Sequence, residues 1–357
     1  MADALGEAVR ATLPLALFLT AALSISADAG RNGLADIATA RLAAWGRGNG
    51  HLLYGLVCAA TLVLTAAVSL DGAVILLVPV VNRLHRVCRV PLRPLFLGCV
   101  VVANASSLAL PQGNPTNLVV IQGLGVDPAT FTRHMAVPSL VATAVIAIAV
   151  AVLDRSALSS GYEAPAGAGR GRLPLAPVLA VVATAGANLA ALALSLPPWA
   201  PICVAAALLW AWRAAQRQGA GFLRAPVRIS VQVLVLVGAT DLAITHLGAA
   251  ATHPGAPVLL TMVGVAAVAA GLAAAVTNLP PSVALGQLPV HLPVAYAALA
   301  GLSVGALIAP RGSVATLIAF DLADDPAPIR RRFARAVAPA AALATAAAVA
   351  LIWAGLA

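Results

Sequence analysis

Long apolar stretches alternate with short polar strings along the whole chain. Stretches of about 17–25 residues have the length of a transmembrane helix, because about 20 apolar residues cross about 30 Å of hydrocarbon. Other stretches are too short to cross alone. The apolar segments lie at about 11–27, 51–68, 73–82, 94–110, 117–124, 134–153, 173–194, 197–212, 229–246, 256–276, 282–290, 293–309, 314–320 and 332–356.

Four polar strings stand inside this apolar pattern. They are Ser69–Gly72, Pro111–Asn117, Thr277–Ser282 and Ala309–Thr316. Broken backbone at membrane depth is tolerated only where it is buried in protein or lines an aqueous cavity. Paired interruptions in corresponding places of two halves are typical of the binding site of a secondary transporter. The pattern therefore predicts a protein that moves a small solute across a membrane.

Two of the strings are predicted to be the tips of re-entrant helical hairpins. Segments 51–68 and 73–82 meet at the first string, and segments 256–276 and 282–290 meet at the third. The second arm of each hairpin is too short to cross a bilayer, so each hairpin is expected to return to the side that it entered from.

The other two strings are predicted to interrupt single crossing helices. Segments 94–110 and 117–124 form one broken helix, and segments 293–309 and 314–320 form the second. Both breaks contain proline and glycine, which interrupt a helix or leave it without a backbone donor.

These elements define an all-α polytopic membrane protein with two inverted repeats, each with a re-entrant hairpin and a broken transmembrane helix. The first repeat is predicted at residues 1–153 and the second at 229–357. A cytoplasmic linker at 154–172 and a two-helix connector at 173–228 lie between them.

Composition agrees with a membrane protein. The chain is 61% hydrophobic and 9% charged, against about 25% charged residues in a typical soluble domain. Its net charge is +9, but the arginines cluster between apolar segments, which indicates a lipid bilayer as partner and no nucleic acid. All 21 basic residues are arginine. With so much alanine and glycine, this indicates a GC-rich bacterial genome and a bacterial cytoplasmic (inner) membrane.

The arginines also predict the topology. With both termini outside, 18 of the 21 basic residues fall in loops 28–50, 83–93, 155–172, 213–228 and 321–335, which would then face the cytoplasm. The exceptions are Arg10, Arg133 and Arg311.

Several classes of function lack their motifs. No P-loop is present, so ATP hydrolysis by this chain is not expected, although an associated ATPase subunit stays open. The acids and histidines do not form a catalytic cluster, so we do not expect an enzyme. The four cysteines have no metal-ligand spacing. No metal or organic cofactor is predicted, and a homodimer stays open.

The strings resemble those of the ion transporter superfamily, and within it the arsenite efflux permeases and the related sodium/proton antiporters. The resemblance covers roughly residues 51–320 and rests on these strings: Ser69-Leu70-Asp71-Gly72-Ala73-Val74, Gly113-Asn114-Pro115-Thr116-Asn117-Leu118, Thr277-Asn278-Leu279-Pro280 and Gly312-Ser313-Val314-Ala315-Thr316-Leu317.

The resemblance implies two inverted repeats that converge on a central site, and coupling to H⁺ or Na⁺. The transport function that it implies first is efflux of arsenite or antimonite. The alternatives are transport of small anions such as dicarboxylates, which Arg311 favours, and sodium/proton antiport.

Two charged residues at the predicted site have two interpretations each. Asp71 either caps the second hairpin arm or carries a proton or cation, since intramembrane acids are costly and usually functional. Arg311 is either a counter-ion for Asp71 or a clamp for an anionic substrate. A second acid, Asp241, is either a proton relay or an interfacial residue near a helix end.

The remaining predicted ligands are neutral. Their oxygens and amides either satisfy the broken backbone or bind substrate and ion beside half-helix N-termini, which carry a partial positive charge. The predicted substrate- and ion-binding residues, in addition to Asp71 and Arg311, are Ser69, Asn114, Thr116, Asn117, Thr277, Asn278, Ser313 and Thr316.

Overall fold

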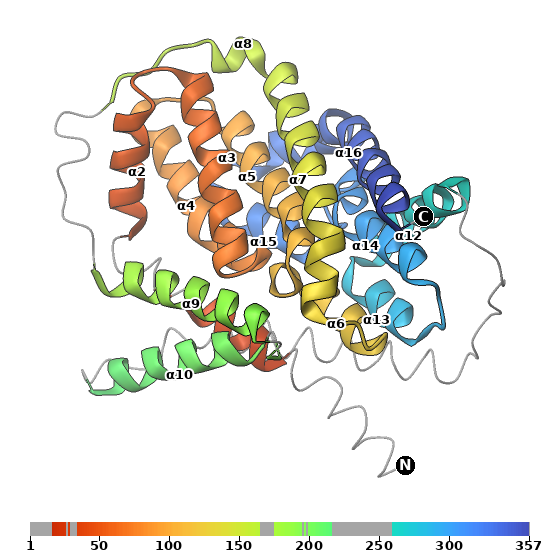
Figure 1. Cartoon of the computed structure of the whole chain (residues 1–357). Coiled ribbons are helices and arrows are strands. Elements are labelled where there is room, and N and C mark those ends of the chain that lie inside the picture. The colour runs from red at the N-terminus through yellow and green to blue at the C-terminus, as the bar shows by residue number, and fades with distance from the viewer. Residues whose placement is uncertain are drawn as a thin grey trace.

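The structure is a computed structural model, and the part of the chain that it describes is helical throughout, with no strand (Figure 1). The predicted all-α class is confirmed. The described residues are 16–25, 28, 34–164, 175–194, 196–197, 199–215 and 259–356.

The first half contains a short N-terminal helix, a hairpin, a broken helix and a long helix. In chain order the elements are helix Ala16–Ile25, α2 (Leu34–Trp45), α3 (Gly50–Ala67), α4 (Leu70–Cys88), α5 (Leu92–Ser106), η1 (Ser107–Ala109), η2 (Pro111–Gly113), α6 (Pro115–Gly123), α7 (Pro128–Leu153) and α8 (Arg155–Leu158).

Two connecting helices precede a second half that again has a hairpin, a broken helix and a long helix. These elements are α9 (Leu175–Ala193), α10 (Ala200–Ala215), α12 (Leu259–Val276), α13 (Leu279–Gln287), α14 (Leu292–Ser303), η4 (Gly305–Ile308), α15 (Val314–Leu322) and α16 (Pro326–Leu356). In Figure 1, α3, α4, α5 and α7 run side by side, and α9 and α10 lie across one end of them.

Both predicted hairpins form, and α4 is longer than expected. α13 has 9 residues, which at 1.5 Å per residue span about 14 Å and cannot cross a bilayer. α4 has 19 residues and runs well past the predicted end at Asn82. At about 28 Å it is long enough to cross, so the expectation that this arm is too short was wrong. Its last turns carry Arg83 and Arg86 on exposed positions. The apolar run that we counted therefore ends before the helix does.

Both predicted broken helices form as well, but each break starts earlier than the prolines indicate. α5 ends at Ser106 and α14 at Ser303, after which each backbone tightens into a 3₁₀ turn. The polar and small residues there allow the i→i+3 geometry before proline forces the stop.

A glycine holds each break in its compact form. A Cβ added to Gly113 would collide with the carbonyl oxygen of Ser107, and one added to Gly312 would collide with that of Ala306. The chain thus folds back on the end of its own first half-helix in both breaks.

The two halves exchange contacts in a reciprocal way. α4 packs on α15, α13 packs on α6, and α7 packs on α16. Each hairpin arm therefore meets the second half-helix of the other half. Reciprocal contacts of this kind are expected for two repeats about a pseudo-twofold axis; their inversion across the membrane remains a prediction.

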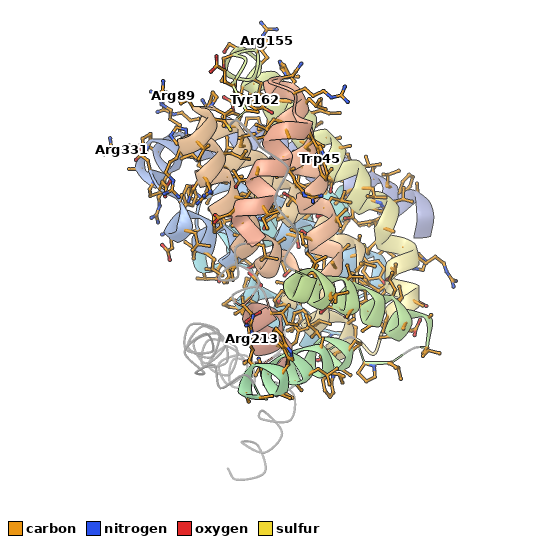
Figure 2. The ribbon with its side chains drawn as sticks, turned by 90° about the vertical axis from the view of Figure 1, so that its left-hand side faces the viewer. Trp45, Arg89, Arg155, Tyr162, Arg213 and Arg331 are labelled. Carbon is orange, nitrogen blue, oxygen red and sulfur yellow. The ribbon has the colours of Figure 1, made fainter. Side chains whose placement is uncertain are left out.

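Five of the described helices are long and apolar enough to cross a membrane, which identifies a multi-pass membrane protein. Arg89, Arg155 and Arg331 lie toward one end of the molecule, as the predicted cytoplasmic loops require (Figure 2). Arg213 lies toward the other end and is buried against Asp28. Arg213 is therefore part of α10 and not of a loop, and the side of the membrane that it faces remains a prediction.

Substituting the break glycines should destabilise the fold. We expect Gly113→Ala and Gly312→Ala each to lower the free energy of unfolding by about 1–3 kcal/mol, the usual range for overpacking. Gly264→Ala in α12 is the matched control, since nothing lies within 4 Å of its added Cβ. Thermal unfolding in detergent measures the difference, and equal melting temperatures for all three variants would contradict the close approach.

The shared side of two arginine-rich loops can be tested by labelling on a cysteine-free background. Cysteines at the exposed positions Val87 and Ala327 should react with an impermeant thiol reagent in inside-out vesicles and not in intact cells. Gln122→Cys, exposed at the end of α6, should show the opposite pattern. Labelling of Val87→Cys and Ala327→Cys from opposite sides would contradict this arrangement.

Candidate functional site

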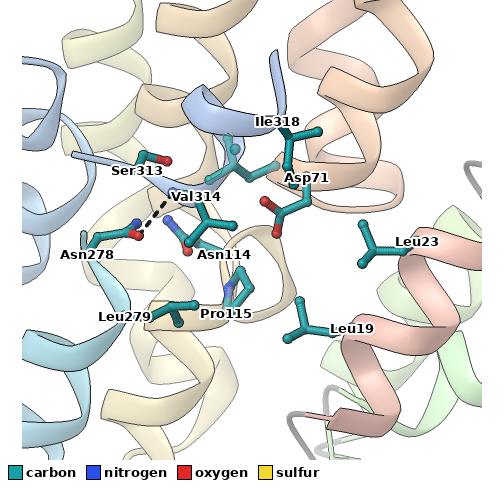
Figure 3. Close-up of a pocket in the computed structure, with 12 residues that line it drawn as sticks. Leu19, Leu23, Asp71, Asn114, Pro115, Asn278, Leu279, Ser313, Val314 and Ile318 are labelled. Atoms are coloured by element: carbon teal, nitrogen blue, oxygen red, sulfur yellow. Dashed lines mark hydrogen bonds between the residues drawn. The ribbon is translucent and has the colours of Figure 1, made fainter. Parts of the chain in front are cut away.

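The four polar strings meet around one small cavity (Figure 3). Each string contributes at least one lining residue: Asp71, Asn114, Asn278 and Ser313. The volume open to the centre of a water molecule is about 10 Å³, and one water needs about 10–15 Å³ by the same measure. The site is therefore closed in this structure, with room for about one water.

Asp71 is the acid of the cavity. It lies in the first turn of α4 with 4% of its surface exposed, and its carboxylate points into the cavity (Figure 3). An acid in the first turn is favoured by the helix dipole. The cap of α4 is Ser69, whose Oγ accepts the N–H of Gly72 at 3.2 Å. The capping interpretation of Asp71 is therefore wrong.

Arg311 lies outside the cavity lining and does not pair with Asp71. Its side chain is exposed, and its Nε donates to the carbonyl oxygen of Ala274 at 3.0 Å. The last carbonyls of a helix have no partner within the helix and carry partial negative charge, so the end of α12 attracts the guanidinium. This competing acceptor is why the predicted counter-ion pair is absent. Anion binding by Arg311 stays a prediction.

Asn114 joins the two broken helices. Its Oδ1 accepts the N–H of Thr116 at 3.1 Å, which caps α6. Its Nδ2 donates to Ser107 Oγ and to Ser303 Oγ, both at 3.2 Å. Ser303 ends α14 in the other half. The Asn114 amide therefore caps the second half-helix of the first break and ties this break to the end of α14 at the second.

Two more amides complete this polar core. Asn117 Nδ2 donates to the carbonyl oxygens of Ser107 at 2.8 Å and Leu110 at 3.0 Å, at the point where the helix stops. Asn104 Nδ2 donates to Val100 O at 2.8 Å and to Thr316 Oγ1 at 3.4 Å, and so connects α5 to α15.

The second hairpin tip reaches the second break through one weak contact. Asn278 Oδ1 accepts the N–H of Val314 at 3.5 Å (Figure 3). Thr277, just before it, has a φ of 72°, a left-handed conformation that is uncommon for a threonine.

Several buried polar atoms at the strings have no hydrogen-bond partner among the described residues. An unsatisfied buried polar group costs about 1–3 kcal/mol, so these atoms are available to a ligand, an ion or water. Ser313 Oγ is the best placed of these atoms to bind a ligand, because Ser313 lines the cavity. The atoms are Thr116 Oγ1, Asn117 Oδ1, Thr277 Oγ1 and Ser313 Oγ.

The structure brings four of the ten predicted binding residues, Asp71, Asn114, Asn278 and Ser313, into the cavity lining. Ser69, Thr116, Asn117, Thr277 and Thr316 stand at the strings without lining the cavity, in addition to the displaced Arg311. Asp241 lies outside the described residues.

Four participants went unnoticed in the sequence. Ser107 and Ser303 sit at the end of the first half of each broken helix, where a small polar residue was a usable signal. Leu19 and Leu23 also line the cavity. As leucines in an apolar segment they carried no signal.

Two re-entrant hairpins and two broken helices around a buried polar cavity define a secondary transporter of small solutes. The family model for citrate transporters, CitMHS, matches residues 7–350, and the chain belongs to this family, which is part of the ion transporter superfamily. The superfamily resemblance is confirmed, whereas the finer resemblance to arsenite permeases is not specifically supported. No curated protein matches the chain.

Removing the Asn114 amide should loosen the whole site. Asn114→Ala loses the α6 cap and two buried hydrogen bonds, and we expect it to lower the free energy of unfolding by about 2–4 kcal/mol. Ser282→Ala is the matched control, because its buried hydroxyl donates only within its own helix, to Leu279 O. The two are compared by thermal unfolding in detergent. Equal stability of the two variants would show that the network does not connect the breaks.

Proposed function

We propose that this chain is an H⁺- or Na⁺-coupled secondary transporter of small carboxylate anions, di- or tricarboxylates, in a bacterial cytoplasmic membrane. The family indicates an ion-coupled secondary transporter, and its name provides the substrate class. The observation that carries the proposal is the buried cavity between two hairpin tips and two breaks, with one acid and several neutral ligands.

Charge in the cavity provides the reason for coupling. Among the described residues, the lining contains the carboxylate of Asp71 and no basic side chain. Two like unit charges 4 Å apart repel by about 4 kcal/mol at an effective dielectric constant of about 20. A carboxylate substrate therefore enters only when Asp71 is protonated or when a cation enters with it. Either event links the substrate to an ion gradient.

The anion itself would be held by neutral groups. α15 begins at the cavity with Ser313 as its N-cap residue, and the Ser313 side chain makes no capping hydrogen bond. The first N–H groups of a helix favour an anion. α6 and α13 also begin there, but their first turns contain Pro115, Pro280 and Pro281, which have no N–H to give. α15 is therefore the better half-site for a carboxylate.

Arsenite or antimonite efflux is the second candidate function. A cavity without a basic side chain also suits a neutral hydroxylated solute, and this observation favours it. Sodium/proton exchange would use the same acid without an organic substrate.

Transport in proteoliposomes separates these functions. With an imposed pH or Na⁺ gradient, the wild-type protein should accumulate radiolabelled citrate or succinate. Asp71→Asn should lose gradient-driven accumulation and keep substrate exchange, because the neutral amide no longer gains or loses a charge. Arg331→Gln, on the exposed end of α16, is the control and should accumulate normally. Gradient-driven movement of arsenite alone, or of Na⁺ and H⁺ alone, would overturn the carboxylate assignment.

A further inference from the structure

We propose that helix Ala16–Ile25 is the lid of the substrate cavity, and that the buried ion pair between Asp28 and Arg213 holds this lid shut. The inference deepens the proposed function: the carboxylate ligand rests on that function, whereas the lid rests on the geometry alone.

Leu19 and Leu23 form the wall that the four polar strings do not supply. Both line the cavity with 3% and 1% of their surface exposed, and they face Asp71 across it (Figure 3). Every other lining residue belongs to α4, α6, α13 or α15, or is the N-cap residue of one of these helices. The lid helix therefore comes from outside the two hairpins and two broken helices.

This wall has to move for a substrate to enter. The closed cavity has room for about one water, and a small carboxylate has several times as many heavy atoms. The strings are joined to one another by buried hydrogen bonds, such as that from Asn114 to Ser303. The two leucines meet the cavity through apolar side chains only, and hydrophobic contact is non-directional. Moving the two leucines away from the cavity therefore breaks no side-chain hydrogen bond of theirs.

The far end of the lid is fixed to α10. Arg213 Nε lies 2.8 Å from Asp28 Oδ1, and its second nitrogen donates to Oδ2 at 2.8 Å. Of these two contacts, the second has the geometry of a hydrogen bond, so the pair combines one charge-assisted hydrogen bond with a close contact between opposite charges. Trp210 Nε1 donates to Ser24 Oγ at 3.1 Å, one turn before Asp28. The guanidinium of Arg213 also stacks 4.7 Å from the ring centroid of Trp212.

The anchor continues from α10 to the first hairpin. α10 packs on α9, and Asn188 of α9 donates its Nδ2 to the carbonyl oxygen of Ala67 at 2.9 Å. Ala67 is the last residue of α3, two residues before the hairpin tip at Ser69. The lid and the acid-bearing tip are therefore held in register through α9 and α10. Asp28 and Arg213 are positioning residues, and Leu19 and Leu23 are the seal.

The state of the lid can be measured without any substrate. In a cysteine-free background, Leu23→Cys should react slowly with N-ethylmaleimide in proteoliposomes. Adding Arg213→Gln should raise this rate by about tenfold or more, because a minor open state is populated at about 10% or less. The charge swap Asp28→Arg with Arg213→Asp should restore the slow rate.

A matched control uses the exposed pair between Arg83 and Asp36, whose nitrogen and oxygen lie 2.8 Å apart. Arg83→Gln should leave the rate of Leu23→Cys unchanged. Where Arg213→Gln does not yield folded protein, Asp28→Asn with Arg213→Gln replaces the pair by two neutral groups and should give the same rise.

An unchanged rate in the folded variant that lacks the ion pair would overturn the lid. A rise produced equally by Arg83→Gln would also overturn it, because the effect would then be general loosening. The labelling is measured without substrate, so a negative result in the carboxylate transport assay does not affect the lid proposal. A negative labelling result, in turn, does not affect the transport assay.

Discussion

The need to satisfy broken backbone inside a membrane shapes this molecule. A helix that stops at membrane depth leaves carbonyl and N–H groups without partners, and hydrocarbon offers none. The first break meets this need with amides: Asn117 donates to two carbonyl oxygens at the break, and Asn114 caps the next half-helix. Asn114 also donates to Ser303, so the side chain that caps the first break also positions the second. The polar cavity exists because these repairs converge.

The two halves solve the same problem with different residues, and the difference is functional. In the first half, the Asn114 amide bonds a backbone N–H and two serine hydroxyls, and the Asn117 amide donates to backbone. In the second half, Ser313 stands at the cap with an unpartnered Oγ, and its half-helix begins at the cavity. Both halves contain unpartnered oxygens, those of Thr116 and Asn117 in the first and those of Thr277 and Ser313 in the second. Of these four residues, Ser313 lines the cavity.

Much of this arrangement could be predicted from the sequence, because helix breakers and polar side chains inside apolar runs have few physical explanations. The hairpins and the breaks followed from that alone, and the meeting of the four strings was implied by the family resemblance. Boundaries were less predictable, since α4 continues as an exposed helix beyond its apolar run and both breaks begin in a 3₁₀ turn. Arg311 was misplaced because its acceptor, the end of α12, depends on packing. Arg213 was counted as a loop charge because nothing in its surroundings identifies Asp28 as its partner. Leu19 and Leu23 are ordinary leucines until the fold brings them to Asp71.

The narrowness of the closed cavity has a consequence for the cell's energy supply. A connected file of hydrogen-bonded waters would conduct protons between the two aqueous phases and dissipate the gradient that drives transport. A space for about one water, walled on one side by Leu19 and Leu23, cannot hold such a file. In this form, the space beside Asp71 offers no path for such a file.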